Sequence, residues 1–276
     1  MKDHSFLKAN RSQPFLIMAH RGFWGGNIIE NSIESSQLAY KAGADIVEVD
    51  VCRSADGVYY LFHNHAEQML LSRSEPFEQL TSTEIDQISV NNSLGVESGY
   101  KLNKLTAFLD WLPENKLVNL DRSWGYWDDP IFFEILKQSG KQKQIVLKSP
   151  VQMAYLNQLA QQNDQWYYIP IVKDRKEIEL VQSYEEIDMI GIELIVTNLD
   201  SNLLEETYIQ ALHDQHLLIV ANAENLGARF NLFGGLTDDH GLLDDGIWRK
   251  FLSLGIDIIQ TDWPNFLSDF RKQIRK

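Results

Sequence analysis

Short apolar runs alternate with amphipathic stretches of helical length along almost the whole chain. Apolar runs of strand length occur at residues 14–20, 46–51, 116–121, 144–148, 167–172, 188–195, 217–221 and 257–261. Stretches with helical periodicity lie between most of them, for example at residues 32–42, 130–139, 150–162, 200–214 and 246–254. Strands that alternate with helices predict βαβ units and a parallel sheet. Eight such strands in a chain of 276 residues predict a single (β/α)8 TIM barrel.

A doubly wound open sheet is the main alternative to the barrel. It would normally use fewer strands and a glycine-rich first turn, whereas the first strand predicted here ends at His20-Arg21-Gly22. The chain contains no internal repeat, no low-complexity tract and no linker long enough to divide it. The sequence therefore predicts one barrel domain over residues 1–276.

A ninth apolar run, at residues 58–63, does not fit the alternation. It follows the run at 46–51 after only the short connection from Cys52 to Gly57. Because parallel strands need a crossover of about a dozen residues or more, this run must return antiparallel. The sequence thus predicts an extra hairpin strand after the second barrel strand.

The dipeptide Asp-Gly at residues 56–57 is a strong signal for a two-residue hairpin turn. With these two residues as the turn, Asp50 would lie opposite His63 and Glu48 opposite His65. Cross-strand partners share one face of a sheet. The hairpin therefore predicts two carboxylates and two histidines on a common patch.

Composition narrows the classes of partner. The formal net charge of −14 argues against a nucleic-acid ligand, because such binding depends on cationic patches. The single cysteine, Cys52, excludes an intrachain disulfide and favours a reducing compartment. No apolar run approaches the roughly 20 residues that span a bilayer, and the first residues lack a signal-peptide core. We therefore expect a cytoplasmic protein without a membrane span.

Chemically useful side chains stand near the carboxyl ends of the predicted strands, where barrel enzymes build their active sites. They are His20, Glu48, Asp50, Asp121, Lys148, Glu193 and Asp262. Two carboxylates on one face of an apolar strand, as at Glu48 and Asp50, are costly to bury without a cation. This pattern indicates a metal site at the barrel mouth.

Several of these residues also have simpler interpretations. Asn31, with Glu34 three residues later, matches a capping box at the start of the helix predicted over residues 32–42. Asp121 is equally suited to cap the helix that follows it. Trp263 comes after the last strand and either walls a pocket or packs beside it.

Taken together, the motifs resemble those of the glycerophosphodiester phosphodiesterase family, whose members have a TIM-barrel fold. The resemblance is carried, in order, by His20-Arg21-Gly22, Glu30-Asn31-Ser32, residues 43–51, Asp56-Gly57, His63 and Thr261-Asp262-Trp263-Pro264. It is dense over residues 18–65 and returns at 255–264. By this resemblance His20 and His63 serve as general acid and base, Arg21 holds the phosphate, and Glu48 and Asp50 bind Mg²⁺ or Ca²⁺.

The chain departs from the family pattern at three places. Asn64 stands where the family usually has Asp, and residues 121–123 read Asp-Arg-Ser where it usually has Glu-x-Lys. Asp121 can replace the glutamate as a metal ligand, and Lys148 can supply the missing lysine. Arg122 is expected to point the other way. Residues 221–227 also differ from the usual Trp-Thr segment.

The predicted function is metal-dependent hydrolysis of a glycerophosphodiester to glycerol phosphate and an alcohol. Glu193 and Trp263 are further candidates for binding this small-molecule substrate, and Glu30 is a candidate supporting residue. One alternative is a related barrel phosphodiesterase that acts on an inositol or sugar phosphodiester. A second is a non-catalytic phosphate-binding protein, which would have no need of a paired acid and base.

Overall fold

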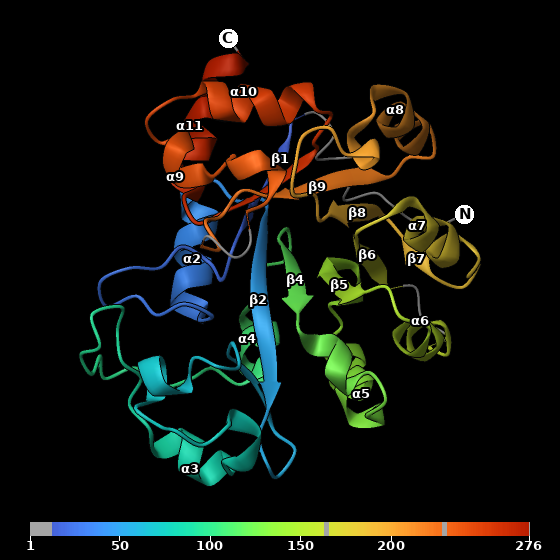
Figure 1. The fold of residues 1–276 in the computed structure, drawn as a ribbon. Helices are drawn as coiled ribbons and strands as arrows, with labels where there is room; N and C mark the ends of the chain where they lie inside the picture. Colours follow the sequence, from blue (N-terminus) through green and yellow to red (C-terminus); the bar gives the residue numbers. More distant parts are fainter. Residues whose placement is uncertain (1–12, 163–165, 228–230, 276) are drawn as a thin grey trace.

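Eight parallel strand positions close into a barrel in the computed structural model, which describes residues 13–162, 166–227 and 231–275 (Figure 1). β1 pairs with both β2 and β10 and so closes the ring. β7 and β8 share one position, because both pair with β6. The strands of the ring are β1 (Leu16–Ala19), β2 (Ile46–Arg53), β4 (Leu117–Asp121), β5 (Ile145–Pro150), β6 (Tyr167–Val172), β7 (Asp188–Met189), β8 (Gly191–Leu194), β9 (Leu218–Asn222) and β10 (Ile258–Thr261). The predicted (β/α)8 barrel is confirmed.

Most of the helices lie around the outside of the barrel (Figure 1). The α-helices are α2 (Ile33–Ala42), α3 (Ser82–Gln87), α4 (Leu105–Trp111), α5 (Pro130–Gln138), α6 (Met153–Ala160), α7 (Arg175–Gln182), α8 (Glu206–Asp214), α9 (Asp238–Gly241), α10 (Gly246–Ser253) and α11 (Pro264–Ile274). Short helical turns occur at Glu67–Leu71, Phe77–Gln79, Ser123–Tyr126, Gln142–Gln144, Asn202–Leu204 and Phe233–Gly235.

Alternate residues of each strand face the barrel interior, as the two-residue period of a strand requires. Towards the amino ends of the strands these residues are apolar and form one buried cluster: Leu16, Met18, Ile46, Leu117, Val146, Tyr167, Ile169, Ile190, Leu218, Val220 and Ile258. The intervening residues, such as Val47 and Val49, pack in a larger cluster beneath the helices. The interior series of β2 therefore runs from Ile46 to Glu48 and Asp50, so the same period that builds the core directs polar side chains into the mouth.

The start of α2 differs from the predicted capping box. Ser32 is the N-cap, its hydroxyl accepts a hydrogen bond from the Ser35 N–H, and the Ser35 hydroxyl accepts one from the Ser32 N–H. Asn31 precedes this cap with a left-handed backbone at φ 52°. The capping role expected for Asn31 is therefore wrong, because the serine one residue later takes it.

The extra antiparallel strand is confirmed as β3 (Tyr59–Leu61), but its predicted register is wrong by one residue. The turn contains three residues, and the Ser54 N–H donates to the Val58 carbonyl across 2.8 Å. Two contacts favour this longer turn. The Ser54 hydroxyl accepts from the Val58 N–H at 2.9 Å, and Asp56 accepts from the Ser82 N–H of α3 at 2.7 Å. Gly57, at φ 88°, supplies the left-handed residue that three-residue hairpin loops need.

This register changes which residues face each other. Val51 pairs with Leu61, and the Phe62 N–H donates to the Asp50 carbonyl at 3.0 Å. Asp50 therefore lies opposite Phe62, and His63 follows one position later. The predicted opposition of Glu48 and His65 is wrong as well, since His65 is exposed beyond the end of β3.

The segment between β3 and α4 forms a separate small layer beside the barrel, at the lower left of Figure 1. Its apolar residues form one cluster with Ile29, Cys52 and Tyr60, and they are Phe62, Ala66, Leu70, Leu71, Phe77, Leu80, Ile85 and Val90. Phe62 stacks on Phe77 with ring centroids 4.6 Å apart. This packing fixes the chain next to His63, one of the residues that reach the mouth.

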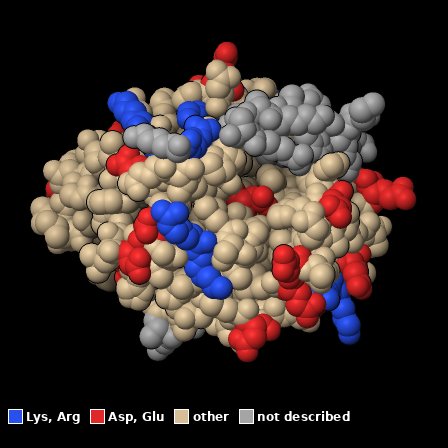
Figure 2. All heavy atoms as spheres, turned by 90° about the horizontal axis from the view of Figure 1, so that it is seen from above, with Lys and Arg blue, Asp and Glu red and all other residues tan. Residues whose placement is uncertain are grey.

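Two surface features bear on possible partners. Across the described ranges, none of the helices is both long and apolar enough to cross a lipid bilayer. On the face seen in Figure 2, Lys and Arg side chains are scattered among Asp and Glu side chains.

Candidate active site

The polar interior positions surround one cavity of about 330 Å³ at the carboxyl ends of the strands. Its walls are formed by His20, Arg21, Asp50, His63, Asp121, Arg122, Lys148, Glu193, Asn222, Glu224, Leu226 and Gln260. Most of the predicted site residues are among them, although they come from widely separated parts of the chain. The convergence expected at the barrel mouth is thus present.

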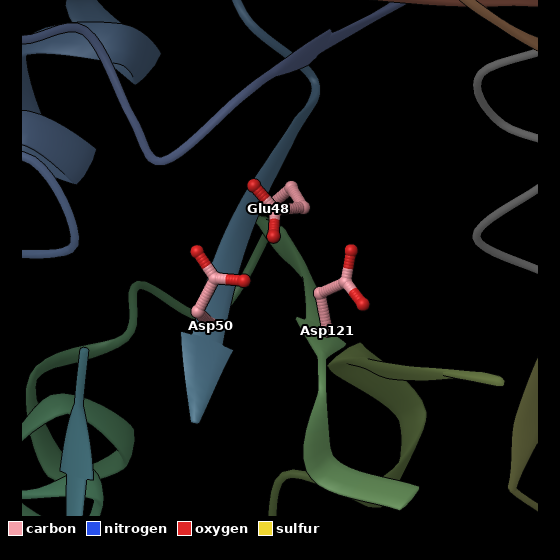
Figure 3. A group of neighbouring side chains, drawn as sticks. All are labelled: Glu48, Asp50 and Asp121. Atoms are coloured by element: carbon pink, nitrogen blue, oxygen red, sulfur yellow. The ribbon is translucent and has the colours of Figure 1, made fainter. Parts of the chain in front are cut away.

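Three carboxylates form the acidic floor of the site (Figure 3). Glu48 and Asp50 come from β2 and Asp121 from β4, and Asp50 pairs in register with Asp121. One oxygen from each lies within 4.8 Å of the others. Burial and then the neighbouring Asp50 charge raise the pKa of Glu48 to about 8. A buried group of hard oxygen donors that repel one another in this way fits a divalent cation such as Mg²⁺ or Ca²⁺.

Asp50 is the best-anchored member of this acidic group. The Asn31 side-chain amide donates to Asp50 Oδ2 at 3.0 Å, and Asn31 Oδ1 accepts from the Asp50 N–H at 2.8 Å. Two guanidinium nitrogens, Nε of Arg21 and Nε of Arg122, each lie 3.3 Å from its carboxylate. The left-handed backbone of Asn31 therefore serves the site, since it aims the amide at Asp50.

Arg21 supplies a fixed cation next to the acidic group. The backbone N–H of Arg21 donates to Glu48 Oε2 at 2.8 Å. Its side-chain Nη1 donates to Oε1 of the buried Glu30, also at 2.8 Å. The turn that follows β1 and contains Arg21 depends on Gly22, which has φ 83° and where a Cβ would collide with Ser35 of α2. Glu30 thus holds the guanidinium of Arg21 in place.

Arg122 points into the cavity, contrary to the expectation that it faces away. β4 ends at Asp121, and Arg122 adopts a left-handed backbone at φ 54°, which breaks the alternation of the strand. Its Nη1 donates to Asn64 Oδ1 at 3.1 Å. Asn64, which stands where the family usually has aspartate, therefore contacts Arg122, which was expected to point away from the cavity.

Lys148 lies inside the mouth and not in the helical layer. It is only 2% exposed, and its Nζ lies 2.7 Å from Asp121 Oδ2 and 3.0 Å from Glu193 Oε2. Burial lowers the pKa of Lys148, but the charges of Asp121 and Glu193 outweigh that effect and raise it well above its usual value. The other oxygen of Glu193 accepts from Asn222 Nδ2 at 3.0 Å. A continuous polar chain therefore runs from β4 through β5 and β8 to β9.

The two histidines have opposite electrostatic surroundings. Nδ1 of His20 lies 2.9 Å from Asp262 Oδ1. Burial lowers the pKa of His20, yet the hydrogen bond with Asp262 and the charge of Glu224 raise it to about 10. Asp262 is itself held by its N–H, which donates to Asp238 Oδ2 at 2.7 Å.

His63 lies on the side of the cavity that carries the two arginines. Burial lowers its pKa to about 4; the charge of Asp50 opposes this change, and the charges of Arg21 and Arg122 add to it. In the absence of a bound ion, the imidazole of His63 is therefore neutral and that of His20 protonated near neutral pH.

The β9 and β10 wall of the cavity was missed by sequence reasoning. Asn222, Glu224 and Gln260 are all buried there, and Gln260 Nε2 donates to Glu224 Oε1 at 2.8 Å. Burial raises the pKa of Glu224 to about 7. The usable signal was the two-residue period, because Asn222 and Gln260 occupy interior positions of otherwise apolar strands.

Trp263 and His65 are not brought into the cavity. Trp263 is 37% exposed, and its ring packs edge-on against Phe266 with centroids 6.2 Å apart. His65 is exposed at φ 75°, so it does not support Glu48. Both residues are close in sequence to residues of the mouth, but neither is among those that line the cavity.

Comparison with known protein families agrees with this architecture. Residues 20–265 match the model of the glycerophosphoryl diester phosphodiesterase family. The chain belongs to this family. Its members are phosphodiesterases, and the protein is accordingly a phosphoric diester hydrolase. A search of curated protein sequences gives no match.

Solved structures of glycerophosphoryl diester phosphodiesterases share the fold. One from Parabacteroides distasonis is 17% identical, with a TM-score of 0.74 over 94% of this chain and 87% of that one. One from Agrobacterium tumefaciens is 20% identical, with a TM-score of 0.69 over 94% and 99%. A phosphodiesterase from Oleispira antarctica, solved with the product sn-glycerol-3-phosphate, is 18% identical, with a TM-score of 0.68 over 97% and 99%.

Within the glycerophosphoryl diester phosphodiesterase family, the departures of this chain gather on two sides of the cavity. Asn64 and Arg122 contact each other beside Asp50. Asn222 and Glu224 lie in the segment that differs from the usual Trp-Thr pattern, on the opposite wall. Glu48, Asp50 and Arg21 follow the family pattern, whereas Asp121 stands where the family usually has glutamate.

Proposed function

We propose that the protein hydrolyses a glycerophosphodiester to glycerol phosphate and an alcohol, using one divalent cation and a histidine acid/base pair. The observation that carries the proposal is a cluster of three carboxylates at one cavity, whose walls also hold three cationic side chains and two histidines. A phosphodiester needs these elements, because its charge must be neutralised and a proton must move on each side of the phosphorus.

Glu48, Asp50 and Asp121 are the residues that would hold Mg²⁺ or Ca²⁺. When bound, the ion shields the charge of a phosphoryl oxygen and lowers the pKa of the attacking hydroxyl. The protein itself keeps these carboxylates in place. The Asn31 side chain donates a hydrogen bond to Asp50, and the backbone N–H of Arg21 donates one to Glu48.

Arg21, Arg122 and Lys148 are the proposed phosphate-binding cations. The two arginines suit bidentate contacts with phosphate oxygens, and Lys148 suits a single point contact. Glu193 contributes through the position it gives Lys148. Trp263, which lies outside the cavity, stays a predicted contact at its rim.

His20 and His63 are the proposed proton carriers. In an in-line displacement, one histidine accepts the proton of the attacking hydroxyl and the other protonates the leaving alcohol. Each such transfer is typically worth about 10²–10⁴-fold in rate. Asp262 fixes the ring of His20 through Nδ1, so Nε2 is the nitrogen that remains for the substrate.

The direct test is hydrolysis of glycerophosphocholine and glycerophosphoinositol with Mg²⁺ or Ca²⁺, followed by chelation with EDTA. We expect release of glycerol phosphate that depends on the added metal. Asp121→Asn should abolish both activity and binding of the metal, whereas Asp110→Asn, at an exposed position of α4, should leave both unchanged. Full activity in the EDTA-treated wild type would refute the proposed metal dependence.

A second candidate is hydrolysis of an inositol or sugar phosphodiester by the same residues. The polar β9 and β10 wall favours it, since Asn222, Glu224 and Gln260 offer more hydrogen-bonding groups than a simple alcohol can use. A cytoplasmic location stays a prediction that a localisation experiment in the native cell would test.

A further inference from the structure

Three buried oxygen atoms on one wall of the cavity have no hydrogen-bond donor among the described residues. They are Oδ1 of Asn222, Oε2 of Glu224 and Oε1 of Gln260. The three residues are only 6%, 5% and 3% exposed, and all of them line the cavity. Buried polar atoms in folded proteins nearly always have a partner, and a group of exceptions in one place requires an explanation.

The orientation of both amides is fixed by the carboxylates next to them. Asn222 Nδ2 donates to Glu193 Oε1 at 3.0 Å, and Gln260 Nε2 donates to Glu224 Oε1 at 2.8 Å. Reversing either amide would place its oxygen against a carboxylate oxygen, with no proton between two acceptors. The amide oxygens are therefore committed to accept hydrogen bonds from outside this network.

The three acceptors are arranged on neighbouring strands. Asn222 and Gln260 pair directly in the register of β9 and β10, and adjacent strands lie about 4.8 Å apart. Glu224 follows β9 by two residues and contacts Gln260. A ligand that satisfies all three must carry several separate donor groups within a few ångströms of one another.

We propose that this wall, the acceptor wall of Asn222, Glu224 and Gln260, binds the hydroxyl groups of a polyol moiety of the phosphodiester. The inference rests on the proposed function, which places the phosphate at Arg21, Arg122 and Lys148 in the same cavity. Hydroxyls on successive carbons supply such donors. An esterified glycerol has two free hydroxyls, and an esterified inositol or hexose has enough for one donor to each of the three acceptors.

Other alcohols fit the wall less well. An esterified choline group has no N–H or O–H donor, so it would leave the three oxygens unsatisfied. An alkyl chain would do the same. The cavity, at about 330 Å³, is at the small end of the range of roughly 300–1,000 Å³ for ligand sites, which suits one compact polyol phosphate.

The first experiment measures the dissociation constants of phosphate monoesters for the wild-type protein by calorimetry. The ligands are myo-inositol phosphate, sn-glycerol 3-phosphate, propyl phosphate, phosphoethanolamine and phosphocholine, which share the phosphate and differ in the attached group. We expect the two polyol esters to bind at least about ten-fold more tightly than propyl phosphate, because a site built for hydroxyls discriminates against analogues that lack them. Equal affinities for all five would overturn the proposal. Tightest binding of either amine ester would also overturn it and assign the wall to an ammonium group.

The second experiment repeats the measurement on Asn222→Leu and Gln260→Met. Each is expected to reduce the advantage of the polyol esters over propyl phosphate by about ten-fold. In Gln260→Met the affinity for propyl phosphate should change by less than about two-fold, whereas Asn222→Leu also releases Glu193 and should weaken the binding of all five esters through Lys148. Gln138→Met, at an exposed position of α5, is the matched control and should keep the wild-type ranking. Retention of the full polyol advantage in both wall variants would refute the assignment. Should a variant fail to fold, the wild-type ranking still decides.

Hydrolysis is measured separately, so that the two proposals fail independently. Metal-dependent hydrolysis of glycerophosphodiesters without any preference for polyol esters would contradict the acceptor wall alone. Preference for polyol esters without hydrolysis of any phosphodiester would contradict the proposed function alone.

Discussion

Replacing Glu48 by glutamine should stabilise the metal-free protein at high pH and abolish its response to metal. Glu48 is 1% exposed, and its carboxylate lies with those of Asp50 and Asp121 within 4.8 Å. Two unit charges at that distance repel by about 3–4 kcal/mol at an effective dielectric constant of about 20. Glutamine keeps the shape of the side chain and can still accept the hydrogen bond from the Arg21 N–H, but it removes the charge.

The pH dependence follows from the pKa of Glu48, which burial and the neighbouring Asp50 raise from 4.5 to about 8. Between these two pH values the folded protein holds the proton and the unfolded chain has lost it. The free energy of unfolding therefore falls as the pH rises through this window, by about 1.4 kcal/mol for each pH unit. The wild type should show this fall across the window, and the glutamine variant should lack it.

The assay is urea or thermal unfolding in EDTA from pH 5 to pH 9, repeated with Mg²⁺ or Ca²⁺. A metal present at about 100 times its dissociation constant should stabilise the wild type by about 2.7 kcal/mol. This corresponds to a rise in Tm of roughly 5–10 °C for a chain of this size. Glu48→Gln should show no such rise, and Glu114→Gln, at an exposed loop position, should behave as wild type.

Two results would refute this reasoning. Parallel pH profiles for wild type and Glu48→Gln in EDTA would mean that Glu48 holds no extra proton in the folded state. A full metal-induced rise in Tm in Glu48→Gln would mean that the carboxylate is not a ligand.

Further expectations concern the histidines, Arg122 and two glycines. His20→Ala and His63→Ala should each lower kcat at least about 10²-fold, with the double variant little worse, and a near-normal kcat of His63→Ala would exclude a paired mechanism. Arg122→Leu should lower kcat/KM by about 10–100-fold, as measured with glycerophosphodiesters, and unchanged kcat/KM would remove it from the phosphate site. Gly43→Ala, at φ 105° and in collision with α11, should cost more than the roughly 1–3 kcal/mol of backbone strain expected for Gly57→Ala, where the space is open. Equal losses of unfolding free energy would contradict the collision at Gly43.

The barrel was predictable because its signal is local and repeated. Each apolar run has strand length and is buried on both faces, so it identifies a barrel strand without knowledge of its neighbours. The rule that barrel sites form at the carboxyl ends of the strands then gathers His20, Asp50, Asp121 and Lys148 at one mouth. Both inferences require only the order of residues along each strand.

The errors arose where contacts between distant residues decide the local structure. The hairpin register depends on Asp56, which is bound by Ser82 of α3, and the dipeptide at 56–57 gives no indication of that contact. Arg122 and Asn31 both adopt left-handed backbones that redirect their side chains to Asp50. The two-residue period of a strand does not extend to Arg122, just beyond the end of β4, or to Asn31, in the loop before α2.

The polar chain that links Asp121, Lys148, Glu193 and Asn222 has a consequence for how this enzyme can be redesigned. Asn222 holds Glu193, which positions the ammonium that balances Asp121. A library that randomises Asn222 to accept a new alcohol therefore also alters the charge balance at the opposite side of the barrel. Selection for a new substrate should then bring compensating changes at Lys148 or Glu193. We therefore expect specificity for the alcohol and affinity for the metal to change together in such a library.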